Sequence, residues 1–447
     1  MKICLVSPYD YPYPGGVTEH IKGLEKYLRL RGHQVMILAP SSNDEDQFLA
    51  GNVRRVGDVV ELPANGSRAR ISFSLGISRV VRDILTTEAF DVIHLHEPLM
   101  PMVPLIVLRQ SETCNVGTFH AFGDESLAYA AARPVLRGYF ERLHGRIAVS
   151  TAARDYISQY FPDDYTIIPN GIDVTRFGAP LAPIARYRDG RPTVLFVGRF
   201  DEPRKGFRTL LQALPLVRTV CPEVRVVVVG KGDAELFADL LPEEPDVVEF
   251  AGYVSAEELP RYYQSCDVYC APSTGQESFG IVLLEGMAAG VPVVASRCVG
   301  YAAVMTHGKE GFLVEPRSPE ALAVALVRVL SDGPLRQAMV AHGRETAARY
   351  DWPVIAARVE AFYEQARERF LAEGGPPHRF SLRRLRHLTP LSGAPGWPLA
   401  DELEQGLDRA TARISDWLGV DTDASPRRPR RPGGGRRSDE DHAADSE

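Results

Sequence analysis

The chain begins with the apolar run Lys2-Ile3-Cys4-Leu5-Val6, continues through Pro14-Gly15-Gly16-Val17, and then places apolar residues at Ile21, Leu24 and Leu28. Spacings of three and four residues predict a helix that buries one face. Gly32 ends this helix, and Val35-Met36-Ile37-Leu38-Ala39 follows as a continuous apolar run. Such a run is typical of a strand buried on both faces of a parallel sheet. The opening stretch therefore predicts a βαβ unit.

Further strands separated by helix-length segments are predicted over 91–96, 115–120 and 145–150. This alternation indicates a doubly wound parallel sheet, so residues 1–168 are expected to form one Rossmann-like α/β domain. After a turn-rich stretch the pattern resumes, with strands predicted over 192–198, 224–229, 247–250, 267–271 and 292–295 and a helix over 319–331. We expect a second Rossmann-like domain over 169–350, a helix over 351–372, and a disordered Pro/Arg-rich tail over 373–447.

Composition narrows the function classes. The 447 residues carry 51 Lys+Arg against 58 Asp+Glu, a net charge of −7, so no global basic field favours nucleic acid, and none is expected as a partner. No leader pattern and no apolar run of about 18 residues is evident, which predicts a cytoplasmic protein. Six cysteines are scattered, and Cys266 and Cys270 have no partner pair or nearby His that would indicate a metal site.

Two stretches could meet an anion. Gly16 stands between the first strand and its helix, where backbone N–H groups can approach a phosphate, although a plain tight turn explains it as well. The strand ending in Val197 delivers Arg199 and Lys205 to its carboxyl end, where ligands of open α/β sheets bind. Two cations there would suit a diphosphate without a metal. Arg204, between them, fits either this role or that of a solvated charge.

A third stretch, Glu277 to Glu285, combines a glycine turn at a predicted helix start with two carboxylates. Glu277 can accept hydrogen bonds from sugar hydroxyls and Glu285 from a ribose, although a surface helix is the alternative. N–H groups of the helix start can donate to phosphate. The residues expected there are Phe279, Gly280, Ile281 and Val282.

Histidines end two of the predicted strands. His120 is expected at the carboxyl edge of the first sheet, well placed to hydrogen-bond a sugar. His94 and His96 are expected on opposite faces of their strand, which argues against joint metal ligation. The only Asp-x-Asp, Asp421-Thr422-Asp423, lies in the tail and is attributed to chance, so no metal-held nucleotide is predicted.

The loop Asn65-Gly66-Ser67-Arg68-Ala69-Arg70 offers amide, hydroxyl and guanidinium groups. They would fit a phosphorylated polyol. An ordinary polar hairpin turn is the alternative.

Taken in order, Pro14-Gly15-Gly16-Val17, Pro169-Asn170-Gly171-Ile172-Asp173, Gly198-Arg199 with Lys205-Gly206, and Glu277 with Glu285 resemble the retaining glycosyltransferases of sequence family four over about residues 1–370. The resemblance implies the GT-B architecture, in which two Rossmann-like domains face each other across a cleft and the last helix crosses back to the first domain. It also implies a nucleotide-diphospho-sugar donor, bound mainly by the second domain, and no tightly bound cofactor.

Within that family the chain is most similar to the phosphatidyl-myo-inositol mannosyltransferases. The matching stretches include Pro8-Tyr9, Asn65-Gly66-Ser67, His94-Leu95-His96-Glu97-Pro98, Thr118-Phe119-His120 and Asp201-Glu202-Pro203-Arg204-Lys205-Gly206. The resemblance implies GDP-mannose as donor, with its diphosphate on Gly16, Arg199 and Lys205. It assigns the transferred sugar to Glu277 and His120 and the ribose to Glu285. The inositol phosphate head group is assigned to Tyr9, Asn65, Ser67 and Arg70.

One departure concerns the membrane. The related enzymes carry a strongly basic helix after the Asn-Gly-Ser segment, whereas here only Arg79 and Arg82 stand there, beside Asp83. The thin basic helix argues against membrane docking by this segment and favours the alternative, a family-four enzyme that makes a soluble glycoside or polysaccharide intermediate from a UDP- or GDP-sugar. The lipid-type pocket residues instead favour an inositol lipid acceptor, with peripheral contact with anionic lipid at the inner face of the cell membrane. A non-catalytic sugar-nucleotide sensor is a further alternative, but it would be expected to lack Arg199, Lys205 or Glu277.

Overall fold

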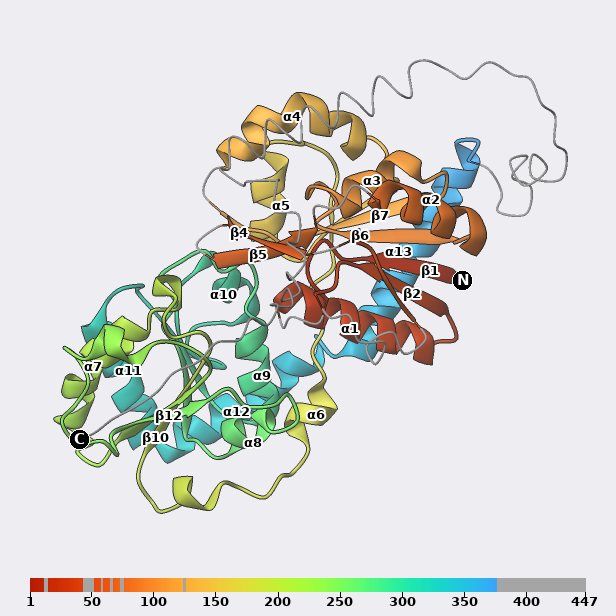
Figure 1. The fold of residues 1–447 in the computed structure, drawn as a ribbon. Helices are drawn as coiled ribbons and strands as arrows, with labels where there is room; N and C mark the ends of the chain where they lie inside the picture. The colour runs from red at the N-terminus through yellow and green to blue at the C-terminus, as the bar shows by residue number, and fades with distance from the viewer. Residues whose placement is uncertain are drawn as a thin grey trace, which may run out of the picture. The chain divides into compact units, whose positions relative to one another are not determined.

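The computed structural model describes residues 1–11, 15–42, 52–57, 59–64, 67–72, 76–123 and 126–375. Its described strands form two parallel sheets and one antiparallel pair (Figure 1). The predicted α/β class with two Rossmann-like units is confirmed. From residue 376 on, the predicted tail lies outside the described residues.

The first sheet has the order β3-β2-β1-β6-β7-β8-β9 among the described strands. Its strands are β1 (Lys2–Val6), β2 (Gln34–Ala39), β3 (Val53–Arg55), β6 (Val92–His96), β7 (Cys114–Phe119), β8 (Gly145–Ala148) and β9 (Thr166–Ile167). The helices between them are α1 (Gly16–Leu30), α2 (Ile77–Glu88), α3 (Val103–Gln110), α4 (Leu127–Phe140) and α5 (Thr151–Ser158). Ile3 pairs in parallel with Val35 on one side and Val92 on the other. The strand order reverses between β1 and β6, where the carboxyl ends of such sheets bind ligands.

The second sheet has the order β12-β11-β10-β13-β14-β15. Its strands are β10 (Thr193–Val197), β11 (Arg225–Val229), β12 (Val248–Gly252), β13 (Val268–Ala271), β14 (Val293–Ser296) and β15 (Gly311–Val314). The helices are α6 (Val174–Gly178), which precedes the sheet, α7 (Phe207–Arg218), α8 (Leu259–Gln264), α9 (Ile281–Ala289), α10 (Val299–Val304), α11 (Pro319–Ser331) and α12 (Gly333–Ala348). Here the order reverses between β10 and β13. The boundary predicted at residue 168 falls between β9 and β10, and the division itself stays a prediction.

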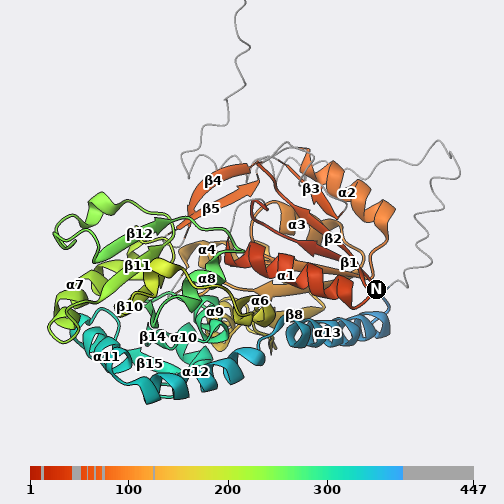
Figure 2. The same ribbon diagram turned by 90° about the horizontal axis from the view of Figure 1, so that it is seen from below.

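The last described helix, α13 (Trp352–Ala372), packs against the first sheet and lies beside α1 (Figure 2). Trp352 is buried, and a Cβ added at Gly23 of α1 would stand 2.2 Å from its ring. The glycine thus lets the indole sit directly on the α1 backbone. Tyr363, fully buried, continues the contact toward β6 and β7.

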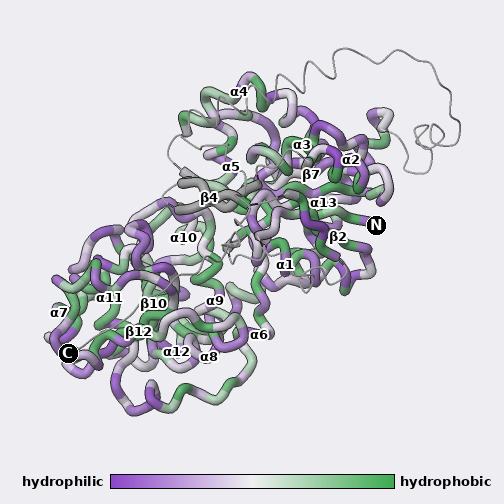
Figure 3. The backbone as a smooth tube through the Cα atoms, in the orientation of Figure 1, coloured by the Kyte–Doolittle hydropathy of each residue, from purple (hydrophilic) through white to green (hydrophobic). Residues whose placement is uncertain are grey.

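The cores follow the strands. Figure 3 shows the hydrophobic colour gathered on strands such as β10, whose first four residues are buried. A separate antiparallel pair, β4 (Val59–Ala64) and β5 (Ser67–Ser72), pairs Ala64 with Ser67. No helix in the described ranges is long and apolar enough to cross a membrane.

Candidate functional site

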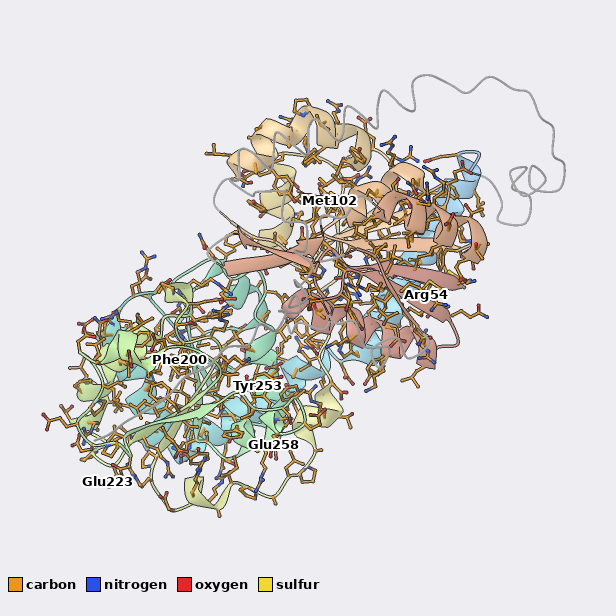
Figure 4. The ribbon with its side chains drawn as sticks, viewed as in Figure 1. Arg54, Met102, Phe200, Glu223, Tyr253 and Glu258 are labelled. Atoms are coloured by element: carbon orange, nitrogen blue, oxygen red, sulfur yellow. The ribbon has the colours of Figure 1, made fainter. Side chains whose placement is uncertain are left out.

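The loop after β10 carries the predicted cations at the carboxyl edge of the second sheet. Phe200, labelled in Figure 4, packs its ring against Phe207 with 5.5 Å between ring centroids, which anchors this loop on the core. Arg199 precedes it, and 47% of its side chain is exposed. The Arg199 guanidinium lies 3.6 Å from carboxylate oxygens of both Asp201 and Glu202. Arg199 therefore stands at the sheet edge as a loosely paired charge within reach of solvent.

Lys205 and Arg204 converge on one carboxylate, that of Glu277. Oε1 of Glu277 accepts hydrogen bonds from Lys205 Nζ at 2.8 Å, from Arg204 at 3.0 Å and from Ser273 Oγ at 3.1 Å. Ser273 follows β13, so the cluster joins the loops after β10 and β13, the two strands at which the sheet order reverses. Arg204 also pairs with Glu202 at 3.0 Å. It is thus not the freely solvated charge that its sequence context allowed.

The backbone brings these loops together through Gly206. Its φ of +71° favours glycine, and an added Cβ would stand 1.8 Å from the Pro272 carbonyl oxygen. A side chain at this position would push the Lys205 loop away from the segment that leads to Glu277.

The charges of the cluster balance one another. Burial alone would raise the pKa of Glu277, but the nearby charges of Lys205 and Arg204 and the hydrogen bonds from Lys205 and Ser273 outweigh it, so this pKa is lowered. Glu277 is therefore ionised at neutral pH and holds both cations in place. A diphosphate would offer these cations a second, more highly charged partner.

The α9 start lies directly beyond Glu277. Gly280 has φ +115°, and an added Cβ would lie 2.8 Å from the Tyr301 ring, so only glycine fits this turn. Phe279 is buried, whereas Ile281 and Val282 are half-buried at the first helical positions. The Gly280 turn thus fixes where the α9 N–H groups begin.

Glu285 lies one turn into α9 and is half-buried. Tyr263 Oη donates a hydrogen bond to its Oε2 at 3.1 Å. Burial raises the pKa of Glu285 to about 7, and the Tyr263 hydrogen bond opposes that rise.

Gly16 begins α1. Among the described residues, a Cβ added at Gly16 would meet no atom within 4 Å, and no side chain caps the helix. The first N–H groups of α1 thus stay available to an anion, as the sequence predicted for this position.

The expectation that His94 and His96 face opposite sides of their strand is wrong. Residues two apart in a strand share a face, and the two ring centroids lie 4.3 Å apart. His94 is a satisfied core residue, bonded to Tyr363 Oη and Thr118 Oγ1 at 2.6 Å each.

His96 instead faces His120, with Nδ1 of His96 3.0 Å from Nε2 of His120. Together with His20 of α1, these two form a buried group whose ligating atoms lie within 4.8 Å of one another. Burial lowers the pKa of all three imidazoles, to about 3 for His20, so they are neutral and suited to a divalent transition metal such as zinc. The expectation that the site holds no metal stays a prediction.

The structure describes three of the four other residues predicted to bind the acceptor head group. Tyr9 is half-buried in the loop after β1, and burial together with Glu97 raises its pKa. Ser67 and Arg70 lie on β5, whereas Asn65 lies outside the described residues. The structure therefore brings Tyr9 close to the Glu97–His120 region, and the head-group role of these residues stays a prediction.

Three contributors escaped the sequence interpretation. Ser273 and Glu202 belong to the Glu277 cluster, and Glu97 accepts the backbone N–H of His120. Ser273 follows a predicted strand end, a signal that could have singled it out. Glu97 stands directly after the two histidines, but sequence spacing does not show a side chain bonding across to the next strand.

Two protein-family models match this chain. A family model described as "Glycosyltransferase Family 4" matches residues 14–176, and one described as "Glycosyl transferases group 1" matches residues 191–332. A phosphatidyl-myo-inositol mannosyltransferase of Mycobacterium leprae is 42% identical over 365 residues, covering 81% of this chain and 96% of the relative. One of Propionibacterium freudenreichii is 37% identical, covering 85% of this chain and 99% of the relative.

Solved structures agree on the architecture. The HepE protein of Anabaena in complex with UDP superposes with a TM-score of 0.66 at 21% identity, covering 82% of this chain and 100% of that one. A glycosyltransferase of Rickettsia africae gives the same TM-score at 19% identity, covering 82% of this chain and 98% of that one. At these identities the likeness extends to the fold alone.

Proposed function

Given that this chain belongs to glycosyltransferase family 4, we propose that it transfers mannose from GDP-mannose to the inositol ring of phosphatidyl-myo-inositol or a related inositol lipid, with retention at the anomeric carbon. The phosphatidyl-myo-inositol mannosyltransferases described above are 37–42% identical over most of the chain, which supports mannosyl transfer to this acceptor class. The observation that carries the proposal is the convergence of Lys205 and Arg204 on the half-buried carboxylate of Glu277.

In this proposal the second domain stabilises the leaving group. Arg199 and Lys205 neutralise the charge that develops on the departing diphosphate, and the N–H groups at the α9 start and at Gly16 donate to its oxygens. These cations do the work that a metal does in other nucleotide-sugar enzymes, so none is required. The Glu285 carboxylate accepts from the ribose hydroxyls.

The sugar lies between Glu277 and His120. The acceptor oxygen attacks the anomeric carbon from the face that the diphosphate leaves: the C–O bond to the acceptor forms as the bond to the diphosphate breaks. The departing phosphate oxygen takes the acceptor's proton. Tyr9, Asn65, Ser67 and Arg70 hold the inositol phosphate head group.

A lipid acceptor requires that the protein work at a membrane surface, and we propose the cytoplasmic face. Arg79, Val80 and Arg82 are exposed on α2 and could meet anionic lipid, but Asp83 is exposed beside them. This mixed charge favours a weak, salt-sensitive attachment. It is also the observation that favours the second candidate, a family-four enzyme acting on a soluble acceptor.

Label transfer tests the proposal. Purified protein is given radiolabelled GDP-mannose or UDP-glucose, with vesicles that contain or lack phosphatidylinositol. The expected result is labelled lipid only with GDP-mannose and phosphatidylinositol together. Donor hydrolysis without labelled lipid would contradict the lipid acceptor and support the soluble one, and labelling from UDP-glucose would contradict the donor.

A further inference from the structure

Glu97 joins the ends of two neighbouring strands at His120. It follows β6, and its Oε1 accepts hydrogen bonds from the backbone N–H groups of His120 and Ala121, at 2.6 Å each. Its own N–H donates to the carbonyl oxygen of Thr118 at 2.8 Å. Main chain and side chain of one residue therefore fix the backbone at the carboxyl end of β7.

The conformation and burial of Glu97 both cost folding free energy. Glu97 has φ +48°, a conformation that residues other than glycine rarely adopt, and only 2% of it is exposed. Strained residues of this kind persist where the surroundings over-determine them, and they cluster at functional sites. A buried carboxyl adds a desolvation cost. The residue that bears both costs holds the histidine that stands at the sheet edge.

We propose that Glu97 is a positioning residue for His120: its carboxylate holds the β7 end so that the imidazole meets the transferred sugar. The inference rests on the proposed function, which places His120 at that sugar. Glu97 itself acts through the backbone of His120 and does not touch the substrate.

The side chains around this hold are uncharged at neutral pH. Among the described residues, ionisable side chains that interact with Glu97 include Tyr9 after β1, Tyr129 of α4 and Tyr156 of α5, and burial raises the pKa of each phenol, so all three are neutral at pH 7. His120, the residue held, is neutral as well because burial lowers its pKa.

The experiment compares Glu97→Gln and Glu97→Ala with wild type in the full-length protein. The matched control is Glu310→Gln, because Glu310 is another buried carboxyl that accepts a backbone N–H, that of Thr306 at 2.8 Å, outside the proposed site. Two quantities are measured: kcat/KM for mannosyl transfer at neutral pH, with kcat and KM determined separately, and hydrogen–deuterium exchange of the peptide that spans residues 118–121. Thermal unfolding confirms that each variant folds.

Glu97→Ala is expected to lower kcat/KM by up to about 100-fold, the effect of a misplacement near 1 Å, and to speed exchange at His120 and Ala121. Glu97→Gln retains a carbonyl acceptor, so it is expected to stay within about tenfold of wild type in kcat/KM. Glu310→Gln should change neither quantity. A Glu97→Gln variant as impaired as Glu97→Ala, or wild-type exchange in Glu97→Ala, would overturn the positioning role.

His120→Ala in parallel separates the two claims. If His120→Ala is fully active while Glu97→Ala still speeds exchange, the sugar-binding role of His120 fails and the backbone hold stands. If His120→Ala is inactive and Glu97→Ala has wild-type exchange and kcat/KM, the proposed site stands and the positioning role fails.

Discussion

Replacing Glu277 by Gln removes one charge from the centre of the candidate site and leaves its shape. In wild type, Glu277 accepts from Lys205 at 2.8 Å, Arg204 at 3.0 Å and Ser273 at 3.1 Å. The Gln carbonyl can still accept, but the two bonds from cations lose their ionic part. A hydrogen bond to a charged group contributes about 1 kcal/mol more than a neutral one, so about 2 kcal/mol of stability should be lost.

Because Lys205 and Arg204 are partly exposed, the expected loss of stability is smaller than the loss for a fully buried ion pair. Lys205 and Arg204 are 19% and 27% exposed, so both can turn toward water once the carboxylate is gone. Removing one partner from a fully buried pair costs about 3–5 kcal/mol. The intermediate exposure therefore favours the lower figure of about 2 kcal/mol.

Urea unfolding at pH 7 measures the loss, and Glu244→Gln serves as the control because Glu244 pairs with Arg218 on the exposed surface of the same domain. The control should unfold like wild type. Because the pKa of Glu277 is lowered from 4.5, its stabilisation is present above pH 4.5 and is lost as pH falls through the lower, folded-state value. The gap between wild type and Glu277→Gln should therefore narrow in acid.

GDP binding and mannosyl transfer respond differently to the loss of the Glu277 charge. Without Glu277 the two cations no longer share their charge with a carboxylate, so GDP should bind as tightly as to wild type or up to about tenfold more tightly. Mannosyl transfer should fall by about 100-fold or more because the sugar hydroxyls lose a charged acceptor and keep only a neutral one. Calorimetry with GDP and initial rates with GDP-mannose give both numbers. Equal losses of GDP affinity and turnover, or wild-type stability, would refute the reasoning.

Three further predictions concern other parts of the chain. Arg199→Ala should lower kcat by about two orders of magnitude, since one charged donor to the leaving group is lost, and initial rates at saturating donor check this; near-normal turnover would remove Arg199 from the mechanism. Gly23→Ala should cost about 1–3 kcal/mol in urea unfolding because its Cβ would stand 2.2 Å from Trp352, whereas Gly138→Ala, in open space on α4, should be neutral or stabilising. Glu97→Gln should raise stability by up to about 3 kcal/mol above pH 7 and by less near pH 4.5, because a carboxyl whose pKa rises from 4.5 to about 7 on folding costs stability as it ionises; equal unfolding curves at pH 8 would contradict that burial cost.

Much of the fold was predictable because parallel strands are apolar on both faces. The run at Val35–Ala39 and the run that ends at Val197 each needed only hydrophobic continuity and flanking turns to be identified. Arg199 and Lys205 were found for the same reason: residues just after such strands gather at one sheet edge.

The parts that escaped depend on contacts between distant segments. Sequence spacing does not show that Ser273 and Arg204 share an oxygen of Glu277, because their loops are distant in the sequence and meet through tertiary contacts such as the packing at Gly206. The prediction placed His94 and His96 on opposite faces of their strand, whereas residues two apart in a strand share a face. Glu97 bonds to backbone N–H groups of the next strand, and any residue type can supply such a donor.

The most direct test of the central claim is the initial rate of mannose transfer from GDP-mannose to phosphatidylinositol vesicles by wild type and by the double variant Arg199→Ala, Lys205→Ala. Arg208→Ala is the control, since Arg208 pairs with Asp239 on an exposed face of α7. The account predicts labelled lipid from wild type and the control, and none above background from a folded double variant. Undiminished transfer by the double variant, or no transfer by wild type, would contradict it.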